Sequence, residues 1–376
     1  MKIKVNNIAQ LYAEVDLATN AGKVIKLSPG IYKLDATMGQ NSGRLELQKD
    51  MTLKGVKGFP DLVIIDASKL PDTSFNPPLS IPAKRTGAIR MGRGFNKLEW
   101  IKVIGNGNAS PLSVIDTDLV LGTTTRIRIA NTIITGGRIG INIRNVGPTC
   151  DGRFIKAELI NNEITGNLVS DAGTQQGQGI VMQNANGASN AVIKATLKKN
   201  YVHGNIRGMR VFNNNGNQAI QQLNSSIVIK SQADKFEENQ TGINLDGGSN
   251  GDTGGTLNDN LVIFDAYGTT IQNNRGIVQD PITLPCGIRL VAGSKGPNGS
   301  DVSNNKVIMK LTDCNVSGNQ DFDIRAYGAF SNNATVAGTK NIVEIHLHGI
   351  SNSATVLPDD SFPAEPAGTN IVKILH

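Results

Sequence analysis

Charged and amide side chains recur at two places in a series of short segments that open with glycine. Examples are GMRVF (208–212), GINLD (242–246) and GIRLV (287–291), whose alternation is typical of strands with one buried face. Stacked in parallel, such strands would carry two outward rows. One row is predicted to contain Arg90, Asn142, Val181, Arg210, Asn244, Arg289 and Asp323, and its neighbour Arg144, Gln183, Phe212, Asp246, Val291 and Arg325. We expect a groove for an extended substrate on this face.

Metal ligands are poorly represented at these positions. Segment 246–252 begins and ends with Asp, like a calcium-binding loop, but Gly248 and Leu257 stand where that loop needs oxygen ligands. The three cysteines, Cys150, Cys286 and Cys314, have no metal-binding spacing. The expectation is therefore no metal and no cofactor, with Ca²⁺ near Asp246 as the alternative.

A repeat of 30 to 45 residues must position these side chains. It is marked by apolar residues, called anchors here, at Ile134, Ile164, Val202, Phe236, Ile271, Val316 and Ile350. Three residues after five of the anchors stands an asparagine: Asn167, Asn205, Asn239, Asn274 and Asn319. Turns stacked about 4.8 Å apart would align these amides as a hydrogen-bonded ladder. The pattern predicts an all-β fold, a right-handed parallel β-helix of roughly ten coils.

The repeat runs nearly end to end, so we expect one domain over residues 1–376. Residues 7–19 place apolar side chains on one helical face, which predicts a helix that caps the open end of the solenoid. A Pro-rich loop is expected at 69–87 and a closing segment at 357–376. Between them each coil shows two recognisable pieces, a long strand ending at the anchor and a short strand opening with glycine.

Two further outward rows are predicted on the long strands. One contains charges of mostly alternating sign: Arg128, Glu158, Thr196, Lys230, Asp265, Lys310 and Glu344. The other begins with three cations and becomes apolar: Arg126, Lys156, Lys194, Val228, Ile263, Ile308 and Ile342. Four aliphatic side chains in a row on a surface suggest a covering loop or a contact between subunits, as in a trimer.

The opening of the chain resembles the pectate lyase-like superfamily of parallel β-helix proteins. The resemblance rests on the helix at 7–19, then "PG-Y-L" within Gly22–Leu34, "KD-TLKG" within Gly43–Val56 and "IID" within Leu62–Ser68. It covers the first two coils by motif and the remainder by architecture.

This resemblance implies a carbohydrate-active enzyme that cleaves an acidic polysaccharide by β-elimination or epimerises it. The C5 proton of a uronate becomes acidic when a cation neutralises the developing enolate. Arg144, Arg210 and Arg289 could supply that cation, and Asp246 could orient them, with Asn244 and Arg90 beside them in the groove. Tyr201 and His203, which flank Val202, are the candidate acid and base. The superfamily's hydrolases use paired Asp residues and G-H-G, whereas this chain has V-H-G at 202–204.

Two other classes of function remain open. One is a non-catalytic β-helix for adhesion, surface assembly or glycan binding, which the single tryptophan favours, because sugar grooves normally carry aromatic platforms. The other is an isomerase or cyclase whose small substrate lies under loops 168–178 and 275–286.

Composition limits the partners and the compartment. The net charge of +6 is modest, and no Lys/Arg cluster with interleaved aromatics indicates nucleic-acid binding. No apolar stretch is long enough to span a membrane. The start, MKIKVNN, lacks the apolar segment of a secretion signal. We expect a cytoplasmic protein, or a secreted or cell-surface one if a leader was removed.

Overall fold

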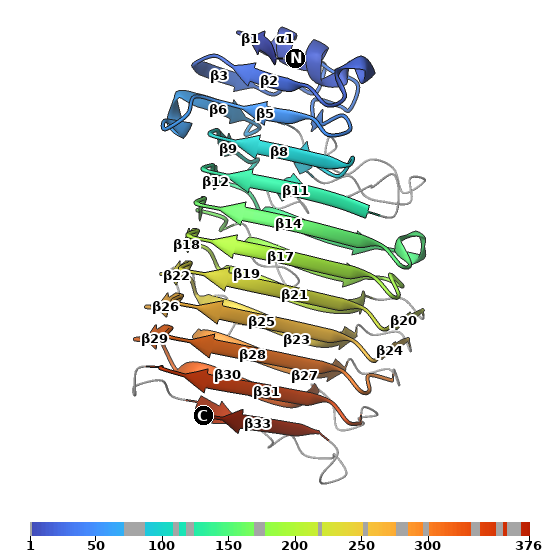
Figure 1. The fold of residues 1–376 in the computed structure, drawn as a ribbon, viewed down its shortest axis with the longest axis vertical. Coiled ribbons are helices and arrows are strands. Elements are labelled where there is room, and N and C mark those ends of the chain that lie inside the picture. Colours follow the sequence, from blue (N-terminus) through green and yellow to red (C-terminus); the bar gives the residue numbers. More distant parts are fainter. Residues whose placement is uncertain are drawn as a thin grey trace.

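The structure is a computed structural model that describes most of the chain. The described residues are 2–70, 87–107, 113–117, 124–168, 177–216, 220–250, 255–275, 285–295, 301–331, 339–350, 356–358 and 370–376. They form one long stack of coils with the two termini at opposite ends (Figure 1). Residues 71–86 of the predicted Pro-rich loop and 359–369 of the predicted closing segment lie outside the described residues.

Three sheets, in which neighbouring strands pair in parallel, run along the stack within the described residues. The first, sheet A, has twelve strands: β1 (Lys2–Val5), β2 (Val24–Leu27), β5 (Thr52–Lys54), β8 (Phe95–Glu99), β11 (Thr124–Ala130), β14 (Phe154–Ile160), β17 (Val192–Lys198), β21 (Ser226–Gln232), β25 (Leu261–Tyr267), β28 (Lys306–Thr312), β31 (Ile342–His348) and β33 (Ile371–Leu375). Sheet B has nine: β3 (Gly30–Lys33), β6 (Val63–Asp66), β9 (Lys102–Ile104), β12 (Ile133–Thr135), β15 (Glu163–Thr165), β18 (Tyr201–His203), β22 (Lys235–Glu237), β26 (Thr270–Gln272) and β29 (Asn315–Ser317).

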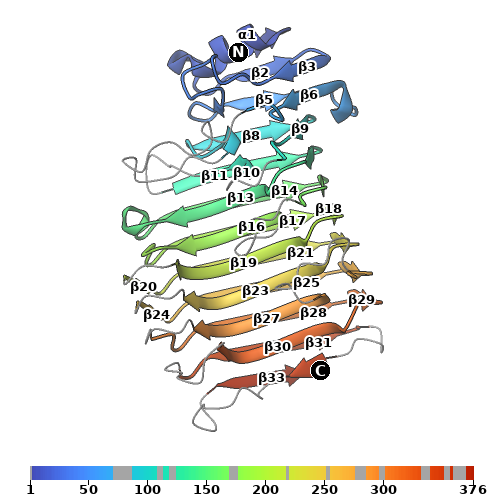
Figure 2. The same ribbon diagram turned by 180° about the vertical axis from the view of Figure 1, so that it is seen from behind.

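Sheet C, which lies behind sheet A in Figure 1 and in front in Figure 2, has ten strands. They are β4 (Leu45–Glu46), β7 (Gly87–Arg90), β10 (Ser113–Asp116), β13 (Ile139–Val146), β16 (Gln178–Ala185), β19 (Arg207–Gly216), β23 (Thr241–Asn250), β27 (Cys286–Lys295), β30 (Phe322–Ser331) and β32 (Val356–Pro358). A small sheet pairs β20 (Gln221–Leu223) with β24 (Thr256–Asn258). The predicted fold class, a right-handed parallel β-helix, is confirmed.

Within the described residues, most coils contribute three strands, where the sequence pattern suggested two pieces. The predicted long strand is divided, as in β17 and β18, and the anchor lies on the second part. One residue between the parts takes the left-handed conformation in successive coils, which turns the chain from sheet A to sheet B. These residues are Trp100, Asn131, Asn161, Lys199, Ala233, Gly268 and Asp313, with φ between 51° and 60°.

The anchors and the asparagine column are confirmed by the strand register. Six anchors from Ile134 to Val316 pair across sheet B, and each is fully buried. Along the turn that follows, Asn167 Nδ2 donates to Asn205 Oδ1 at 2.9 Å, and Asn205 Nδ2 donates to Asn239 Oδ1 at 3.1 Å. The ladder continues through Asn274 and Asn319 and ends on Asp323 Oδ1. Equivalent positions are therefore vertical neighbours.

Further amide ladders are present that the sequence pattern did not reveal. One lies between sheets A and B, where Asn162 and Asn200 donate in turn and Asp234 accepts at the end. Another runs through Asn260, Asn305 and Asn341, each of which directly precedes a strand of sheet A in the sequence. These side chains satisfy backbone groups that the turns would otherwise leave buried and unpaired.

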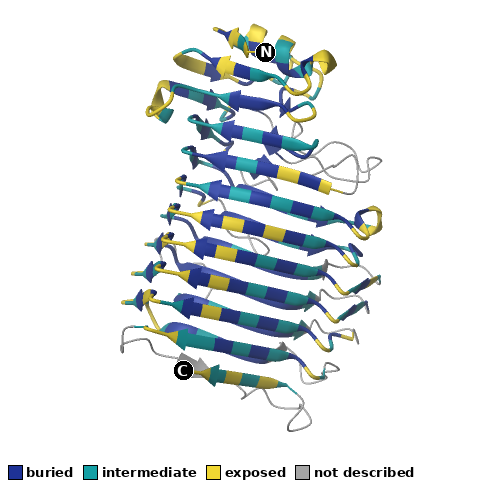
Figure 3. Cartoon of the chain, in the orientation of Figure 1, coloured by how far each residue is buried: buried dark blue, intermediate teal, exposed yellow. Residues whose placement is uncertain are grey.

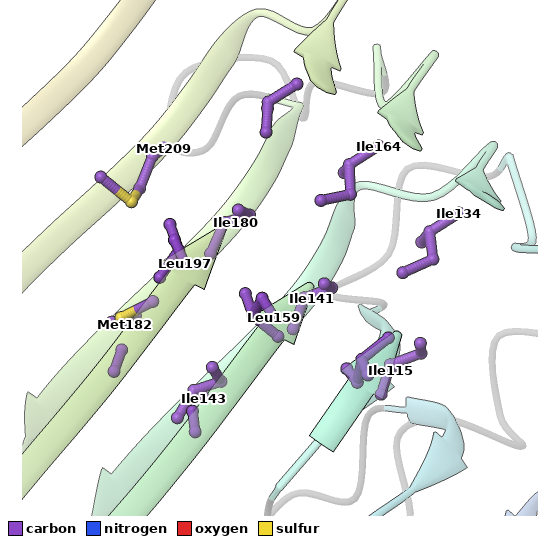
Figure 4. Close-up of a cluster of buried hydrophobic side chains, with 14 of the residues drawn as sticks. Ile115, Ile134, Ile141, Ile143, Leu159, Ile164, Ile180, Met182, Leu197 and Met209 are labelled. Atoms are coloured by element: carbon purple, nitrogen blue, oxygen red, sulfur yellow. The ribbon is translucent and has the colours of Figure 1, made fainter. Parts of the chain in front are cut away.

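The core consists of aliphatic columns between the sheets. In Figure 4, Ile141, Ile180 and Met209 from adjacent coils lie one above another, and all are fully buried. Buried and exposed residues alternate along the strands of sheet A (Figure 3). The leading glycines of sheet C have a packing reason, because a Cβ on Gly208 would lie 2.6 Å from the carbonyl oxygen of Gly242 in the next coil.

The predicted capping helix is present as α1 (Ile8–Asp16). Asn7 is its N-cap, and its side chain accepts from the N–H of Gln10 at 2.9 Å. Leu11, Tyr12 and Val15 are buried under the helix, and the Tyr12 hydroxyl donates to Gly43 O at 2.7 Å. Three short 3₁₀ helices complete the described helical structure: η1 (Ala18–Asn20), η2 (Pro60–Leu62) and η3 (Pro148–Cys150).

The outward rows of sheet A are confirmed except in the penultimate strand. Lys310 pairs with His346 and Ile308 pairs with Glu344, whereas the predicted partners were Glu344 and Ile342. The predicted anchor Ile350 caused this shift of two residues, because it lies after β31 and outside sheet B. Val228, Ile263 and Ile308 are neighbours in the strand register and half-buried. The subunit contact that they suggest stays a prediction.

Candidate active site on the arginine face

The predicted substrate-binding rows lie on the outer surface of sheet C. We call this surface the arginine face and define it by Arg144, Arg210, Asn244, Asp246, Arg289 and Arg325. In the strand register, Arg210, Asn244 and Arg289 are successive partners, and Asp246 follows Phe212 in the adjacent row. The alternation of β-strands turns these side chains away from the apolar core. The structure thus brings together most of the residues that the sequence predicted for this face.

Asp246 is the centre of the arrangement. Its carboxylate is buried, with 5 % of the side chain exposed, and lies between two arginines of the adjacent coils. Arg210 Nε is 3.9 Å from Oδ2, and Arg289 Nη1 is 3.5 Å from Oδ1. Arg289 Nη1 also donates to Asn244 Oδ1 at 3.4 Å. Asp246 therefore approaches guanidinium groups from both adjacent coils.

Aromatic rings hold the guanidinium groups in place. Arg210 lies 4.3 Å above the ring of Phe212, and Arg289 and Arg325 lie 5.6 Å and 5.0 Å from the ring of Tyr327. Stacking on a ring fixes the plane of a guanidinium while leaving N–H groups at its edge available. The arrangement is suited to planar recognition of a carboxylate.

Burial lowers the pKa of the Arg210 guanidinium, and the neighbouring Arg289 lowers it further, while Asp246 opposes both effects. An arginine nevertheless keeps its proton in proteins, so the lowered pKa indicates a poorly solvated cation. An anion that displaces the remaining water would relieve this cost. Arg210 is 19 % exposed at its side chain, so it is still reachable from solvent.

The strand β30 differs from the sequence prediction in its register. Arg289 pairs with Arg325, and Val291 pairs with Tyr327, whereas Asp323 and Arg325 were the predicted partners. Asp323 instead ends the asparagine ladder. The buried pair Ile288 and Ile324 sets the register, and matching inward aliphatics in place of the leading glycine would have found it.

Arg90 lies on the same sheet but apart from this cluster. It is four coils from Arg210, about 19 Å along the stack at the usual strand spacing. Its guanidinium is 3.5 Å from Glu46 and 3.7 Å from Asp116, and only 3 % of the side chain is exposed. Its predicted role in binding substrate stays a prediction, and its contacts are those of a buried ion-pair network. Arg144 is half-buried, two coils from Phe212.

The structure places Tyr201 and His203 on a different surface. Both are on β18 of sheet B, and the ladder turn at Asn205 separates them from β19 of sheet C. Their rings stack with centroids 4.0 Å apart, and His203 Nε2 is 3.3 Å from Glu163 Oε1. Burial, followed by the nearby carboxylates of Glu237, Glu238 and Glu163, raises the pKa of Tyr201. The outward side chains of β18 thus lie on sheet B and those of the arginine face on sheet C, and the role of Tyr201 and His203 as acid and base stays a prediction.

Within the described residues, no group of three or more His, Cys, Asp and Glu side chains is arranged to hold a metal ion. Among the described helices, none has the length and apolar character needed to cross a bilayer.

Comparison with known proteins relates the chain to others by fold. No protein-family model matches it, and no curated protein matches it. The A-module of a mannuronan C-5 epimerase from Azotobacter vinelandii is 14 % identical, with 96 % of this chain and 99 % of that chain covered and a TM-score of 0.40. A DFA-IIIase from Arthrobacter chlorophenolicus is 12 % identical, with 98 % and 86 % covered and a TM-score of 0.38. A pectate lyase is 14 % identical, with 95 % and 76 % covered and a TM-score of 0.36.

Proposed function

We propose that the chain is a carbohydrate-active enzyme that cleaves an acidic polysaccharide by β-elimination, or epimerises it, on the arginine face. Its three parallel sheets, wound in one stack, form the pectate lyase-like architecture that the sequence suggested. The observation that carries the proposal is the placement of Arg210 and Arg289 on either side of Asp246, which brings two guanidinium groups together on one outer surface. The names of the solved structures with a similar fold include an epimerase and a lyase, which is consistent with this class of reaction.

The chemistry assigned to the arginines is electrostatic. A base removes the C5 proton of a uronate, and the electron pair moves into the carboxylate to give an enolate. Arg210 and Arg289 stabilise the added negative charge by donating hydrogen bonds to the carboxylate oxygens. Expulsion of the substituent at C4 then completes elimination, whereas return of a proton to the opposite face of C5 completes epimerisation.

Loss of the C5 proton signal tests this proposal for both reactions together. The protein is incubated with alginate, pectate and glycosaminoglycans in D₂O, and the signal of the C5 proton is followed by proton NMR. Epimerisation replaces this proton with deuterium, whereas elimination leaves C5 in a double bond, which absorbance from an unsaturated uronate detects. We expect loss of the C5 proton signal with at least one polymer. Saturable binding of these polymers with neither loss of this signal nor an unsaturated product would contradict the enzyme and support the non-catalytic glycan-binding alternative.

Substitution of the arginines tests the assignment of the site. We expect Arg210→Ala and Arg289→Ala each to lower the rate of C5 proton loss roughly 100-fold, the usual effect of removing one donor to a developing oxyanion. Arg289→Lys keeps the charge but loses the planar fork, so its effect should be intermediate. Arg128→Ala is the matched control, since Arg128 is a partly exposed arginine on the outer face of sheet A. Full activity of Arg210→Ala with unchanged melting would remove the arginine face from the mechanism.

A further inference from the structure

A cleft of about 320 Å³ lies outside the arginine face, along the turns that join sheet A to sheet B. Gly58 and Pro60, in the segment before β6, close one side, and this segment projects from the stack beside the short strands of sheet B (Figure 1). The lining includes Trp100, Asn131, Asn161, Glu163, Lys199 and Tyr201. Four of them occupy the same turn position in successive coils, so the cleft is elongated, about 14 Å along the stack.

Trp100 is the unusual residue of this turn. It has φ 58° at the left-handed position, where the following coils hold asparagine, lysine, alanine, glycine or aspartate. Bulky side chains seldom adopt this conformation, and such outliers gather at functional sites. The indole is half-buried and lines the cleft, so it offers part of its ring to a ligand. Tyr201, also in the lining, supplies a second aromatic ring.

The polar lining presents paired hydrogen-bonding groups. Asn161 Nδ2 donates to Asn131 Oδ1 at 2.8 Å, which aligns the two amides. Among the described residues, neither Asn131 Nδ2 nor Asn161 Oδ1 has a partner, so one donor and one acceptor remain beside each other. This combination matches a hydroxyl-bearing ligand, because a hydroxyl both donates and accepts.

The charge of the cleft differs from that of the arginine face. Glu163 and Lys199 line it with opposite charges, and Glu163 is also in contact with His203 at 3.3 Å. Their charges cancel, so the cleft provides no excess of cations for an acidic polymer. Its size falls in the range of small-molecule sites, and it combines aromatic surface with a few placed polar groups.

We propose that this cleft binds a neutral oligosaccharide, with a sugar ring lying on Trp100 and its hydroxyl groups hydrogen-bonded to Asn131 and Asn161. The site is separate from the proposed catalytic face and does not depend on the reaction assigned there.

Trp100 is the only tryptophan of the chain, so its fluorescence reports on this cleft without a label. The intact protein is titrated with cellohexaose, mannohexaose and xylohexaose, and emission and quenching by acrylamide are recorded. We expect a saturable change in emission and protection from the quencher with at least one of the three. Asn161→Gly removes the amide at a position where glycine accepts the backbone conformation, and it should weaken binding about tenfold.

Ala233→Gly is the matched control, because Ala233 occupies the same turn position (φ 54°) in a coil outside the cleft. It should bind as wild type does. The proposal is overturned if none of the three hexasaccharides alters Trp100, if Asn161→Gly binds as tightly as Ala233→Gly, or if oligouronates protect Trp100 better than the neutral sugars do. None of these readouts requires turnover, so failure here is distinguishable from failure of the enzyme proposal.

Discussion

At the scale of single residues, the structure shows why equivalent charged positions have different roles. Arg90 and Arg210 occupy the same row of sheet C, yet Arg90 lies between two carboxylates and is almost fully buried. Arg210 shares the carboxylate of Asp246 with Arg289 and stays partly exposed. This difference in surroundings, and not the residue type, is the reason that we propose Arg210 and not Arg90 as a ligand for an anion.

Asp234 supports a prediction about pH. Burial raises its pKa from 3.8 to about 6, although hydrogen bonds from Ser231 and Asn200 oppose the shift. Between these pH values the folded protein keeps a proton that the unfolded chain has released, so stability falls as pH rises toward 6 and then levels. Relative to Asp234→Asn, wild type should lose roughly 2 kcal/mol of unfolding free energy between pH 4 and pH 7.

Urea unfolding of both proteins across this pH range measures the difference. Asp265→Asn, which changes an exposed carboxylate of sheet A, is the control and should follow wild type. A constant difference between wild type and Asp234→Asn at every pH would show that Asp234 titrates normally.

At the scale of elements, the ladder at Asn205 holds the turn between sheets B and C. Asn205 Nδ2 donates to Ile164 O, His203 O and Asn239 Oδ1, and its Oδ1 accepts from the N–H and Nδ2 of Asn167. Because the site is buried, water cannot replace these partners. The short strands β15, β18 and β22 depend on such side chains for their spacing.

Position in the ladder should decide how much each asparagine contributes. We expect Asn205→Ala to lower the unfolding free energy by roughly 3 kcal/mol, since it leaves several buried groups unpaired. Asn319→Ala should cost less, roughly 1 kcal/mol, because Asn319 is half-exposed near the end of the ladder and water can reach its partners. Equal losses, measured by urea unfolding, would contradict the ladder as a buried network.

At the scale of the whole molecule, a solenoid has open ends, and α1 covers one of them. The helix buries Leu11 completely against the first coils, while Leu17, just beyond it, remains 49 % exposed. Removing the cover would expose the aliphatic columns and the strand edges at this end.

Leu11→Asp tests the cap. We expect the variant to self-associate, because a buried carboxylate would displace α1 from the core. Leu17→Asp adds the same charge at an exposed position and should behave as wild type does. Size-exclusion chromatography with light scattering distinguishes the outcomes, and an unchanged mass for Leu11→Asp would show that the end needs no cover.

The sequence alone determined the repeat, the asparagine column and the outward rows, because each depends on a periodicity that is visible in the amino-acid sequence. Spacing from Ile164 to Val202 to Phe236 fixes the stacking, and alternation within each strand fixes the side of the sheet. The asparagine ladder that includes Asn205 was predicted from the same spacing of the anchors. The shift in β30 arose where the leading glycine, and with it the visible register, was absent, and the shift in β31 arose from taking Ile350 as an anchor.

Only the tertiary structure decided which outward rows of side chains lie on the same surface. The left-handed residue between sheets A and B is asparagine, lysine, alanine or tryptophan in different coils, so the residue type does not identify that turn in the sequence. That turn and the next place Tyr201 and His203 on a separate surface from Arg210, although they are close in sequence. The cleft at Trp100 likewise requires side chains from several coils to meet beside an inserted segment. Periodicity specifies neighbours along the stack, whereas the angle between sheets depends on backbone conformations that many residue types can adopt.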